Sequence, residues 1–294
     1  MSAAPHVGVV FPPWFPPERL RPTALAAEAA GVDELWVWED SFLESGIASA
    51  AAVLGWTDSV RVRIGLTPAP FRSVALLAME IATLDRLFPG RFRCVVGHGV
   101  QSWMGQAGVR ARSPLQLLEE YVVVLNRLLA GEEVTVSGDY VRLDGVRLAW
   151  PPLGPCSVLA GATGRRSLAL IGDMAPGVLV DSGNSPRMLV DVLDVVRSGA
   201  AAAGRTDVPE VVVYVHTAFG PEAAQRLRAH VGDPDPGGHP RGLAGSTAEV
   251  AAGVREYADS GAGTVVLRPL EDDPDIEGFA AIAGEVAGFV AGRG

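Results

Sequence analysis

The sequence predicts an α/β fold, more narrowly a (β/α)8 TIM-like barrel with insertions. Short β-branched runs alternate with longer Ala/Leu-rich amphipathic runs, the pattern of a parallel sheet covered by helices. Eight such units fit the 294 residues, which suits one closed barrel of roughly 250 residues plus insertions. The alternative is an open doubly wound sheet, but no G-x-G-x-x-G motif follows the first strand.

The expected strands are short and rich in Val, Ile and Leu. In chain order they are Val7–Phe11, Glu34–Trp38, Val60–Thr67, Phe92–Val96, Ser157–Ala160, Gly177–Val180, Glu210–Phe219 and Thr264–Arg268. Each is followed by at least one expected helix. These helices are Glu18–Ala30, Gly46–Trp56, Val74–Leu87, Pro114–Ala130, Arg166–Ile171, Pro186–Ala203, Glu222–Val231, Thr247–Ser260 and Ile276–Val290.

Glycine and proline mark several of the boundaries. Gly31 is expected to cap the first helix at its carboxyl end, and Pro89-Gly90 ends the third. The alternation breaks between 134 and 148, where Ser137-Gly138-Asp139 and Asp144-Gly145 are typical of hairpin turns. We therefore expect a single domain, residues 1–294, with an inserted hairpin near 132–150.

Composition excludes several classes of function. A formal net charge of −10 disfavours nucleic acid and anionic membrane surfaces as partners. No apolar stretch reaches the 18 residues of a membrane span, and no signal peptide is recognisable at the amino end. Two cysteines, Cys94 and Cys156, make no disulfide framework, which favours a cytoplasmic protein. Lysine is absent, so a ligand phosphate or carboxylate has to be held by arginine, backbone N–H groups or helix amino ends.

In a (β/α)8 barrel the working face lies at the carboxyl ends of the strands, so the residues there are the candidates. Trp14 follows the first strand within a proline-rich segment, and it either lines a substrate pocket or belongs to a rigid structural loop. Glu39 and Asp40 follow the second strand. Each is a candidate catalytic acid or base, or a hydrogen-bond acceptor for a cofactor ring; the alternatives are a helix cap and a solvated pair.

The loop after the fourth strand is the most informative segment. Gly97 and Gly99 flank His98 and allow backbone to approach a ligand closely. His98 is a candidate proton donor to substrate, against the alternative of a histidine bonded to backbone. Gln101 and Trp103 are candidate substrate contacts, with packing under a lid as the alternative for Trp103.

Two further strand ends complete the predicted site. Thr67 and Pro68, after the third strand, form either a bulged strand end with a cis peptide against a flat ligand or an ordinary trans turn. The segment after the fifth strand is a candidate anion site at a helix amino end, or a plain glycine-rich turn; its residues are Gly161, Ala162, Thr163, Gly164, Arg165 and Arg166. Asp181 to Asn184 is expected to cap the sixth helix rather than line the pocket. No metal-ligand spacing is present.

Six segments, in order and at similar spacing, resemble the bacterial luciferase-like superfamily, in particular the oxidoreductases that use coenzyme F420 and include methylenetetrahydromethanopterin reductase. The segments are Glu34–Asp40, Leu76–Arg91, Gly97–Gln106, Ser113–Tyr121, Leu129–Leu143 and Gly245–Val250. The resemblance implies a dimeric barrel with the cofactor at its mouth. It also implies an acidic residue of the second strand near the cofactor ring, at Glu39 or Asp40, where Ser41 replaces the histidine that often follows.

The resemblance further implies a cis peptide near Thr67-Pro68 behind the ring, and a cofactor phosphate held by Gly161 to Arg166, with Arg165 or Arg166 in place of the lysine of relatives. The function expected is therefore hydride transfer between coenzyme F420 and a small organic substrate. Two alternatives stay open: an FMN-dependent monooxygenase of the same superfamily, and a binding barrel without a cofactor.

Overall fold

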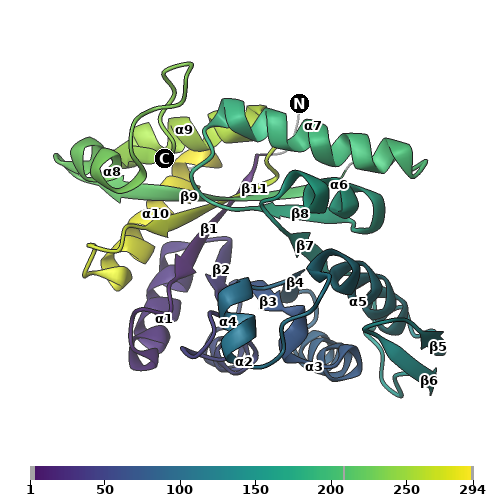
Figure 1. Cartoon of the computed structure of the whole chain (residues 1–294). Helices are drawn as coiled ribbons and strands as arrows, with labels where there is room; N and C mark the ends of the chain where they lie inside the picture. Colours follow the sequence, from purple (N-terminus) through teal and green to yellow (C-terminus); the bar gives the residue numbers. More distant parts are fainter. Residues whose placement is uncertain (1–3, 208, 293–294) are drawn as a thin grey trace.

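The computed structural model describes residues 4–207 and 209–292, and its centre is a closed ring of parallel strands (Figure 1). In ring order the strands are β1 (His6–Phe11), β2 (Glu34–Val37), β3 (Arg61–Pro68), β4 (Phe92–Gly97), β7 (Leu159–Gly161), β8 (Gly177–Val180), β9 (Glu210–Phe219) and β11 (Thr264–Pro269). The ring closes because β11 pairs with β1 while β8 pairs with β9. The predicted barrel is confirmed, and the open sheet is excluded.

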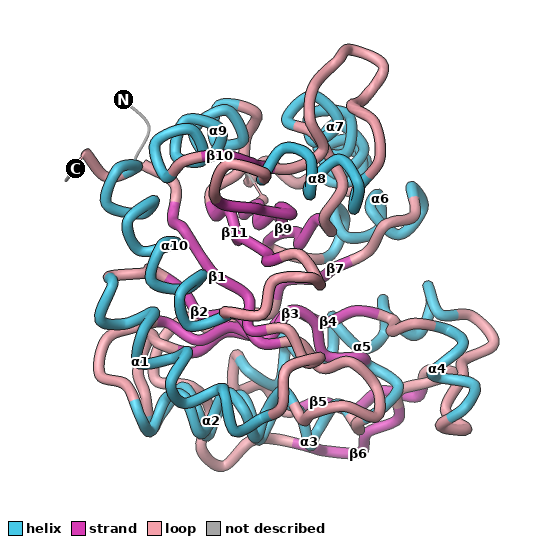
Figure 2. The backbone as a smooth tube through the Cα atoms, turned by 90° about the vertical axis from the view of Figure 1, so that its left-hand side faces the viewer, coloured by secondary structure: helices cyan, strands magenta, loops and turns pink. Residues whose placement is uncertain are grey.

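Helices surround the ring on its outer side (Figure 2). They are α1 (Leu20–Ala30), α2 (Gly46–Trp56), α3 (Val74–Leu87), α5 (Pro114–Leu129), α6 (Arg165–Met174), α7 (Pro186–Ala202), α8 (Ala223–Val231), α9 (Thr247–Asp259) and α10 (Ile276–Val290). The short helix α4 (Gln101–Gln106) follows β4 at the carboxyl end of the barrel. No helix in the described part of the chain is long and apolar enough to cross a membrane.

Two short elements differ from the sequence prediction, and the inserted hairpin agrees with it. Helix α4 forms inside the segment expected to be a loop, because Met104 is fully buried and fixes one turn against the barrel. Strand β10 (Leu243–Gly245) adds to β9 in a stretch expected to be a loop. The antiparallel pair β5 (Val134–Ser137) and β6 (Arg142–Val146) falls within 132–150 and lies outside the barrel beside α5 (Figure 1).

The barrel interior is filled by side chains and is not a pore. One buried cluster inside the ring contains Val10, Trp36, Val95, Val212 and Val266, with Tyr214 and Trp38 nearer the mouth. Trp36 fits because two strands beside it carry glycine. A Cβ on Gly8 would lie 2.9 Å from the Trp36 ring, and one on Gly65 would lie 2.8 Å from it. The much larger cluster lies between the strands and the helices. The lower part of the barrel is therefore solid, and a ligand has room only at the mouth.

Helices α6 and α7 approach each other closely enough that only glycine fits at two crossing positions. A Cβ on Gly172 would lie 1.9 Å from the carbonyl oxygen of Val196, and one on Gly199 would lie 1.9 Å from that of Ala169. A methyl group at either position would push backbone away from backbone, and no side chain can move aside to relieve the contact.

Replacing Gly172 with alanine is therefore expected to lower the free energy of unfolding by about 1–3 kcal/mol, the usual range for overpacking. Gly55→Ala is the matched control, because Gly55 lies in α2 with open space around the new methyl group. That change should stabilise the protein by about 0.5–1 kcal/mol through helix propensity. Urea denaturation of both variants measures the difference, and equal midpoints would contradict the tight helix contact.

Candidate active site

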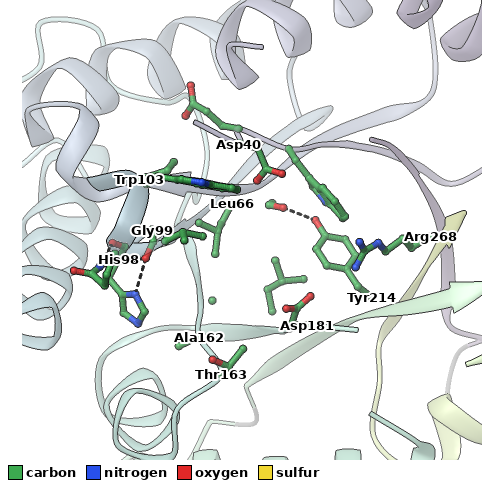
Figure 3. A pocket seen from close by; sticks show the side chains of 18 residues that line it. Asp40, Leu66, His98, Gly99, Trp103, Ala162, Thr163, Asp181, Tyr214 and Arg268 are labelled. Carbon is green, nitrogen blue, oxygen red and sulfur yellow. Dashed lines mark hydrogen bonds between the residues drawn. The ribbon is translucent and has the colours of Figure 1, made fainter. Parts of the chain in front are cut away.

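A cavity of about 530 Å³ opens at the carboxyl ends of the barrel strands (Figure 3). Its walls come from the segments that follow β2, β4, β7 and β8, and from the inward faces of β3, β9 and β11. The predicted site residues that line it are Glu39, Asp40, Pro68, His98, Gly99, Gln101, Trp103, Gly161, Ala162 and Thr163. The fold therefore brings four of the predicted strand ends to one place.

The floor of the cavity is the kinked end of β3. The register of β3 against β4 shifts between Gly65 and Thr67, and Leu66 projects into the cavity at this bulge. Gly97 and Gly161 make room for it, since a Cβ on either would come within 2.6 Å and 2.9 Å of the Leu66 side chain. The cis peptide joins Gly65 to Leu66. Its predicted place near Thr67-Pro68 was wrong by two residues, because a proline is the usual sequence sign of a cis bond and none stands at this one.

Thr67 itself turns away from the cavity. It is fully buried, and its hydroxyl lies 3.3 Å from the sulfur of Cys94 on the neighbouring strand. The buried position raises the pKa of the Cys94 thiol to about 12, so this cysteine is an inert core residue. Pro68, one residue further, does line the cavity. Successive strand residues face opposite sides of the sheet, so only one of the two predicted residues reaches the ligand side.

Tyr214 of β9 fixes the kinked strand from across the barrel. Its hydroxyl donates a 2.7 Å hydrogen bond to the carbonyl oxygen of Gly65. Burial raises the pKa of Tyr214 well above its usual value, so the hydroxyl keeps its proton and remains a donor. A side chain on Gly65 would collide with this hydroxyl at 2.1 Å. Sequence reasoning missed Tyr214, although its inward position followed from the alternation along the strand.

The two carboxylates after β2 have different environments. Both oxygens of Glu39 accept hydrogen bonds from Arg72, at 2.5 and 2.6 Å, and one also accepts the backbone N–H of Gly46 at the start of α2. Among the described residues Asp40 has no such partner, and it points into the cavity (Figure 3). Burial raises the pKa of Asp40, Arg268 acts against this shift and Asp181 adds to it. Of these two residues, only Asp40 therefore has a carboxyl group free to exchange a proton with a ligand.

The wall opposite His98 carries a positive charge that the sequence did not predict. Arg268 of β11 donates from Nη1 to the hydroxyl of Ser182 at 2.7 Å, and its guanidinium lies 4.8 Å from the centre of the Trp38 ring. Asp181 lines the same side (Figure 3). The prediction that Asp181 to Asn184 caps the next helix was wrong, because the N-cap of α7 is Ser185, the residue after that segment, and Asp181 lines the cavity instead.

Trp14 stands behind this wall. Its ring packs edge-on against Trp38, with 6.0 Å between the ring centres, and the Arg268 guanidinium lies 5.8 Å from it. It is not among the residues that line the cavity. Trp14 thus supports Trp38 and Arg268 from outside, and the proline-rich segment around it is a structural loop at this edge of the mouth.

The loop after β4 is held by its own side chains. Nδ1 of His98 lies 3.3 Å from the carbonyl oxygen of Gly99, and the Gln101 amide donates to the carbonyl oxygens of His98 and Gly99 at 3.0 and 3.2 Å. Gly99 has a φ of 69°, a left-handed conformation that favours glycine. The contact with Gly99 requires the proton of a neutral His98 ring on Nδ1, so that Nε2 is the acceptor.

The segment after β7 passes from the cavity to a helix amino end. Ala162 and Thr163 line the cavity, while Gly164, Arg165 and Arg166 lie beyond it. Gly164 is the N-cap of α6 and provides no side-chain cap, so the first N–H groups of this helix have no side-chain acceptor from that position. Both arginines are exposed. In the described residues, no three His, Cys, Asp or Glu side chains are placed to hold a metal ion.

A family model described as luciferase-like monooxygenase matches residues 2–234 of this chain. The chain belongs to the luciferase-like monooxygenase family. It is 30% identical over 213 residues to a 5,10-methylenetetrahydromethanopterin reductase of Methanolobus tindarius, covering 72% of this chain and 64% of that protein. It is 31% identical over 205 residues to an F420-dependent glucose-6-phosphate dehydrogenase of Nakamurella multipartita, covering 65% and 60%. The matches thus span less than two thirds of either relative.

Solved structures share the fold at lower identity. An F420-dependent secondary alcohol dehydrogenase in complex with an F420–acetone adduct superposes with a TM-score of 0.82 at 20% identity, covering 97% of this chain and 98% of that one. The F420-dependent tetrahydromethanopterin reductase of Methanopyrus kandleri gives 0.81 at 19% identity, covering 96% and 98%. Together with the family match, this confirms the resemblance predicted from the six sequence segments and the luciferase-like form of the barrel.

Proposed function

We propose that this protein is an oxidoreductase that transfers a hydride between coenzyme F420 and a small organic substrate bound in the cavity at the barrel mouth. The relatives at about 30% identity are named as F420-dependent enzymes or as methylenetetrahydromethanopterin reductases. The observation that carries the proposal is the cavity itself. It joins an apolar floor, one unpaired carboxyl group and, at one end, a helix amino end without a side-chain cap.

The residues present fit such a cofactor. A flat ring needs backbone and apolar atoms beneath it, which Leu66 and the two glycines that make room for it supply. A phosphate needs N–H groups and positive charge. We assign its binding to Gly164, Arg165 and Arg166 at the start of α6, where the helix dipole and two arginines favour an anion. The deazaflavin supplies the hydride chemistry when bound, and the protein supplies orientation and proton exchange.

Two groups are placed to exchange protons with substrate. We assign Asp40 as the main acid or base, because its carboxyl is unpaired and partly desolvated in the cavity. His98 stands on the opposite wall with Nε2 as its acceptor atom, and we assign it as a second hydrogen-bond partner of substrate (Figure 3). Glu39 is assigned a structural role, because Arg72 occupies both of its oxygens.

A titration with F420 tests the proposal, with FMN as the competing cofactor of the monooxygenase alternative. Saturable quenching of F420 fluorescence is expected, with affinity at least about tenfold higher than for FMN, a difference of about 1.4 kcal/mol. A panel of secondary alcohols and ketones then supplies hydride donors and acceptors. Hydride transfer is measured as a change in the absorbance of the deazaflavin. Preferred binding of FMN would favour the monooxygenase, and binding of neither cofactor would favour the binding barrel.

We further propose that the protein is a homodimer in the cytoplasm. Helix α3 exposes Leu76, Met79 and Leu87, at 45%, 56% and 65%, on one face at helical spacing. Exposed apolar side chains on one face of a helix are typical of a surface that pairs with another copy. Both cysteines are free, as in a reducing compartment.

Sedimentation velocity tests the dimer. The wild type is expected to sediment as a dimer, and Met79→Glu as a monomer, because an unpaired charge would be buried at the centre of the contact. Glu256→Gln, at an exposed position of α9 on the opposite side of the barrel from α3 (Figure 1), is the control and should stay dimeric. A monomeric wild type would contradict this proposal without bearing on the cofactor.

A further inference from the structure

A second cavity, of about 440 Å³, lies on the outer side of the barrel. It is open to solvent on one side and bounded by the start of α3, by residues 108–112 before α5, and by the hairpin β5–β6. Its volume falls in the range of small-molecule sites. The cofactor and substrate of the proposed reaction belong to the mouth cavity, and the two cavities share no lining residue.

The lining of this second cavity is positively charged. Arg110, Arg112 and Arg142 all line it, and no Asp or Glu does. This is unusual in a chain of net charge −10. Arg72 is a fourth lining arginine, but Glu39 and Glu80 already neutralise it. Three exposed arginines therefore line one open-sided cavity without a neutralising carboxylate in its wall.

The three arginines also lack the partners that other arginines of the chain have. Arg127, Arg205 and Arg226 each form an ion pair with a carboxylate. Within residues 4–207 and 209–292, Arg110 and Arg112 form neither an ion pair nor a hydrogen bond, and Arg142 donates only Nε, to the carbonyl oxygen of Gly138. Most of their N–H donors remain available to a ligand.

The nearest acidic side chains are committed elsewhere. Glu120 accepts the backbone N–H groups of Asp139, Tyr140 and Val141, and Asp139 accepts from Gln116. These bonds hold the hairpin against α5, so they shape one wall of the cavity. At another wall, Tyr121 is almost fully buried, and its hydroxyl has no hydrogen-bond partner in the described structure. Such a group favours an incoming acceptor.

We propose that this cavity binds a small polyanion with two or more phosphate or carboxylate groups, held by Arg110, Arg112 and Arg142. A planar guanidinium group can donate two parallel hydrogen bonds to a phosphate or to a carboxylate. Two sources carry this chemistry. One is a free metabolite. The other is the anionic tail of F420, and this source rests on the proposed function. The tail would reach past Pro68, which lines the mouth cavity and immediately precedes Ala69 and Pro70 in the wall of the second cavity.

Isothermal titration calorimetry of the full chain with pyrophosphate and with citrate tests the proposal. At least one of these anions is expected to bind at 50 mM salt and to bind more weakly at 500 mM. Arg142→Gln and Arg110→Gln should each weaken binding about tenfold or more, as expected for a lost charge-assisted hydrogen bond. Arg147→Gln is the matched control. Arg147 lies beyond the end of β6 and is exposed, but it lies outside the cavity, so its loss should leave affinity unchanged.

Three outcomes would overturn the proposal: neither anion binds, the cavity variants bind as the wild type does, or Arg147→Gln weakens binding as much as Arg142→Gln. F420 titrated into the same variants separates the two sources. Unchanged F420 affinity in Arg142→Gln, together with weaker pyrophosphate or citrate binding, assigns the site to a free metabolite. A parallel loss assigns it to the cofactor tail. The anion titrations need no bound cofactor. Their result therefore tests the anion site even if the protein does not bind F420.

Discussion

Asp40→Asn is expected to lower kcat for hydride transfer about a hundredfold or more, with little change in the affinity for F420. Asparagine keeps the shape of the side chain but cannot give or take a proton. General acid–base catalysis by a positioned carboxyl typically contributes a factor of this size. The effect should appear in kcat because Asp40 points into the cavity and acts on the reacting group. The measurement is steady-state turnover with the best substrate of the alcohol and ketone panel.

Asp181→Asn is the matched control, since it removes a carboxylate from the same cavity by the same substitution. Its effect on kcat should be much smaller, because Oδ1 of Asp181 already accepts hydrogen bonds from the N–H and hydroxyl groups of Ser182. Equal losses in the two variants would show that the cavity needs negative charge in general. Full activity of Asp40→Asn would remove Asp40 from the mechanism.

Asp40→Asn should also change the stability of the fold in a pH-dependent way. Burial raises the pKa of Asp40 in the folded state above its value in the unfolded chain. The folded protein is then favoured where Asp40 is protonated, and this contribution is lost as pH rises through the raised pKa. Asp40→Asn should therefore melt higher than the wild type at pH 7 but not at pH 3. A Tm difference that does not depend on pH would contradict the shift.

Arg72→Met is expected to destabilise the fold by about 3–5 kcal/mol, the usual effect of removing one partner of a buried ion pair. Arg72 is largely buried and pairs with Glu39 through two short hydrogen bonds, and with Glu80 through Nε at 3.1 Å. Without it, two largely buried carboxylates face each other without a counter-charge. The corresponding fall in Tm is on the order of 10 °C for a domain of this size.

The control is Arg197→Met, which removes an exposed pair with Asp194 and should change stability by less than about 1 kcal/mol. The double variant Glu39→Gln, Arg72→Met should regain part of the loss, because one unpaired charge disappears with its partner. Denaturation in urea measures these three variants and the single variant Glu39→Gln. If the double variant were as unstable as the sum of the single changes, Glu39 and Arg72 would not act as a pair.

The barrel was predictable from the sequence because each of its units has a local signal. Continuous apolar runs mark β1 and β9, a glycine ends α1, and the Ser and Pro residues that start α5 lie where the pattern changes. The same locality explains what was missed. Helix α4 is held by one buried methionine, and β10 by three residues paired to β9, which is too little for a periodic pattern.

The residues of the candidate site were also predictable only where a local sequence signal marks them. The sequence placed Asp40, His98, Gln101 and the loop after β7 at the mouth, because the residue after a barrel strand always faces that end. It did not find Tyr214 or Arg268, whose neighbours in the cavity are distant in the chain. It also assigned Glu39 and Asp40 the same role, although they differ entirely in partners.

The sequence by itself thus determined the barrel, its family and the strand ends that carry the site. Hydrophobic periodicity and the order of the motifs can be read from short segments, and these segments together specify the fold. Only the tertiary structure decided which of two adjacent carboxylates faces the ligand, where the strand kinks beneath it, and which arginines gather without carboxylates on the outer side of the barrel. Those outcomes depend on contacts between segments far apart in the chain, where one buried partner, such as Arg72 for Glu39, changes what a side chain can do.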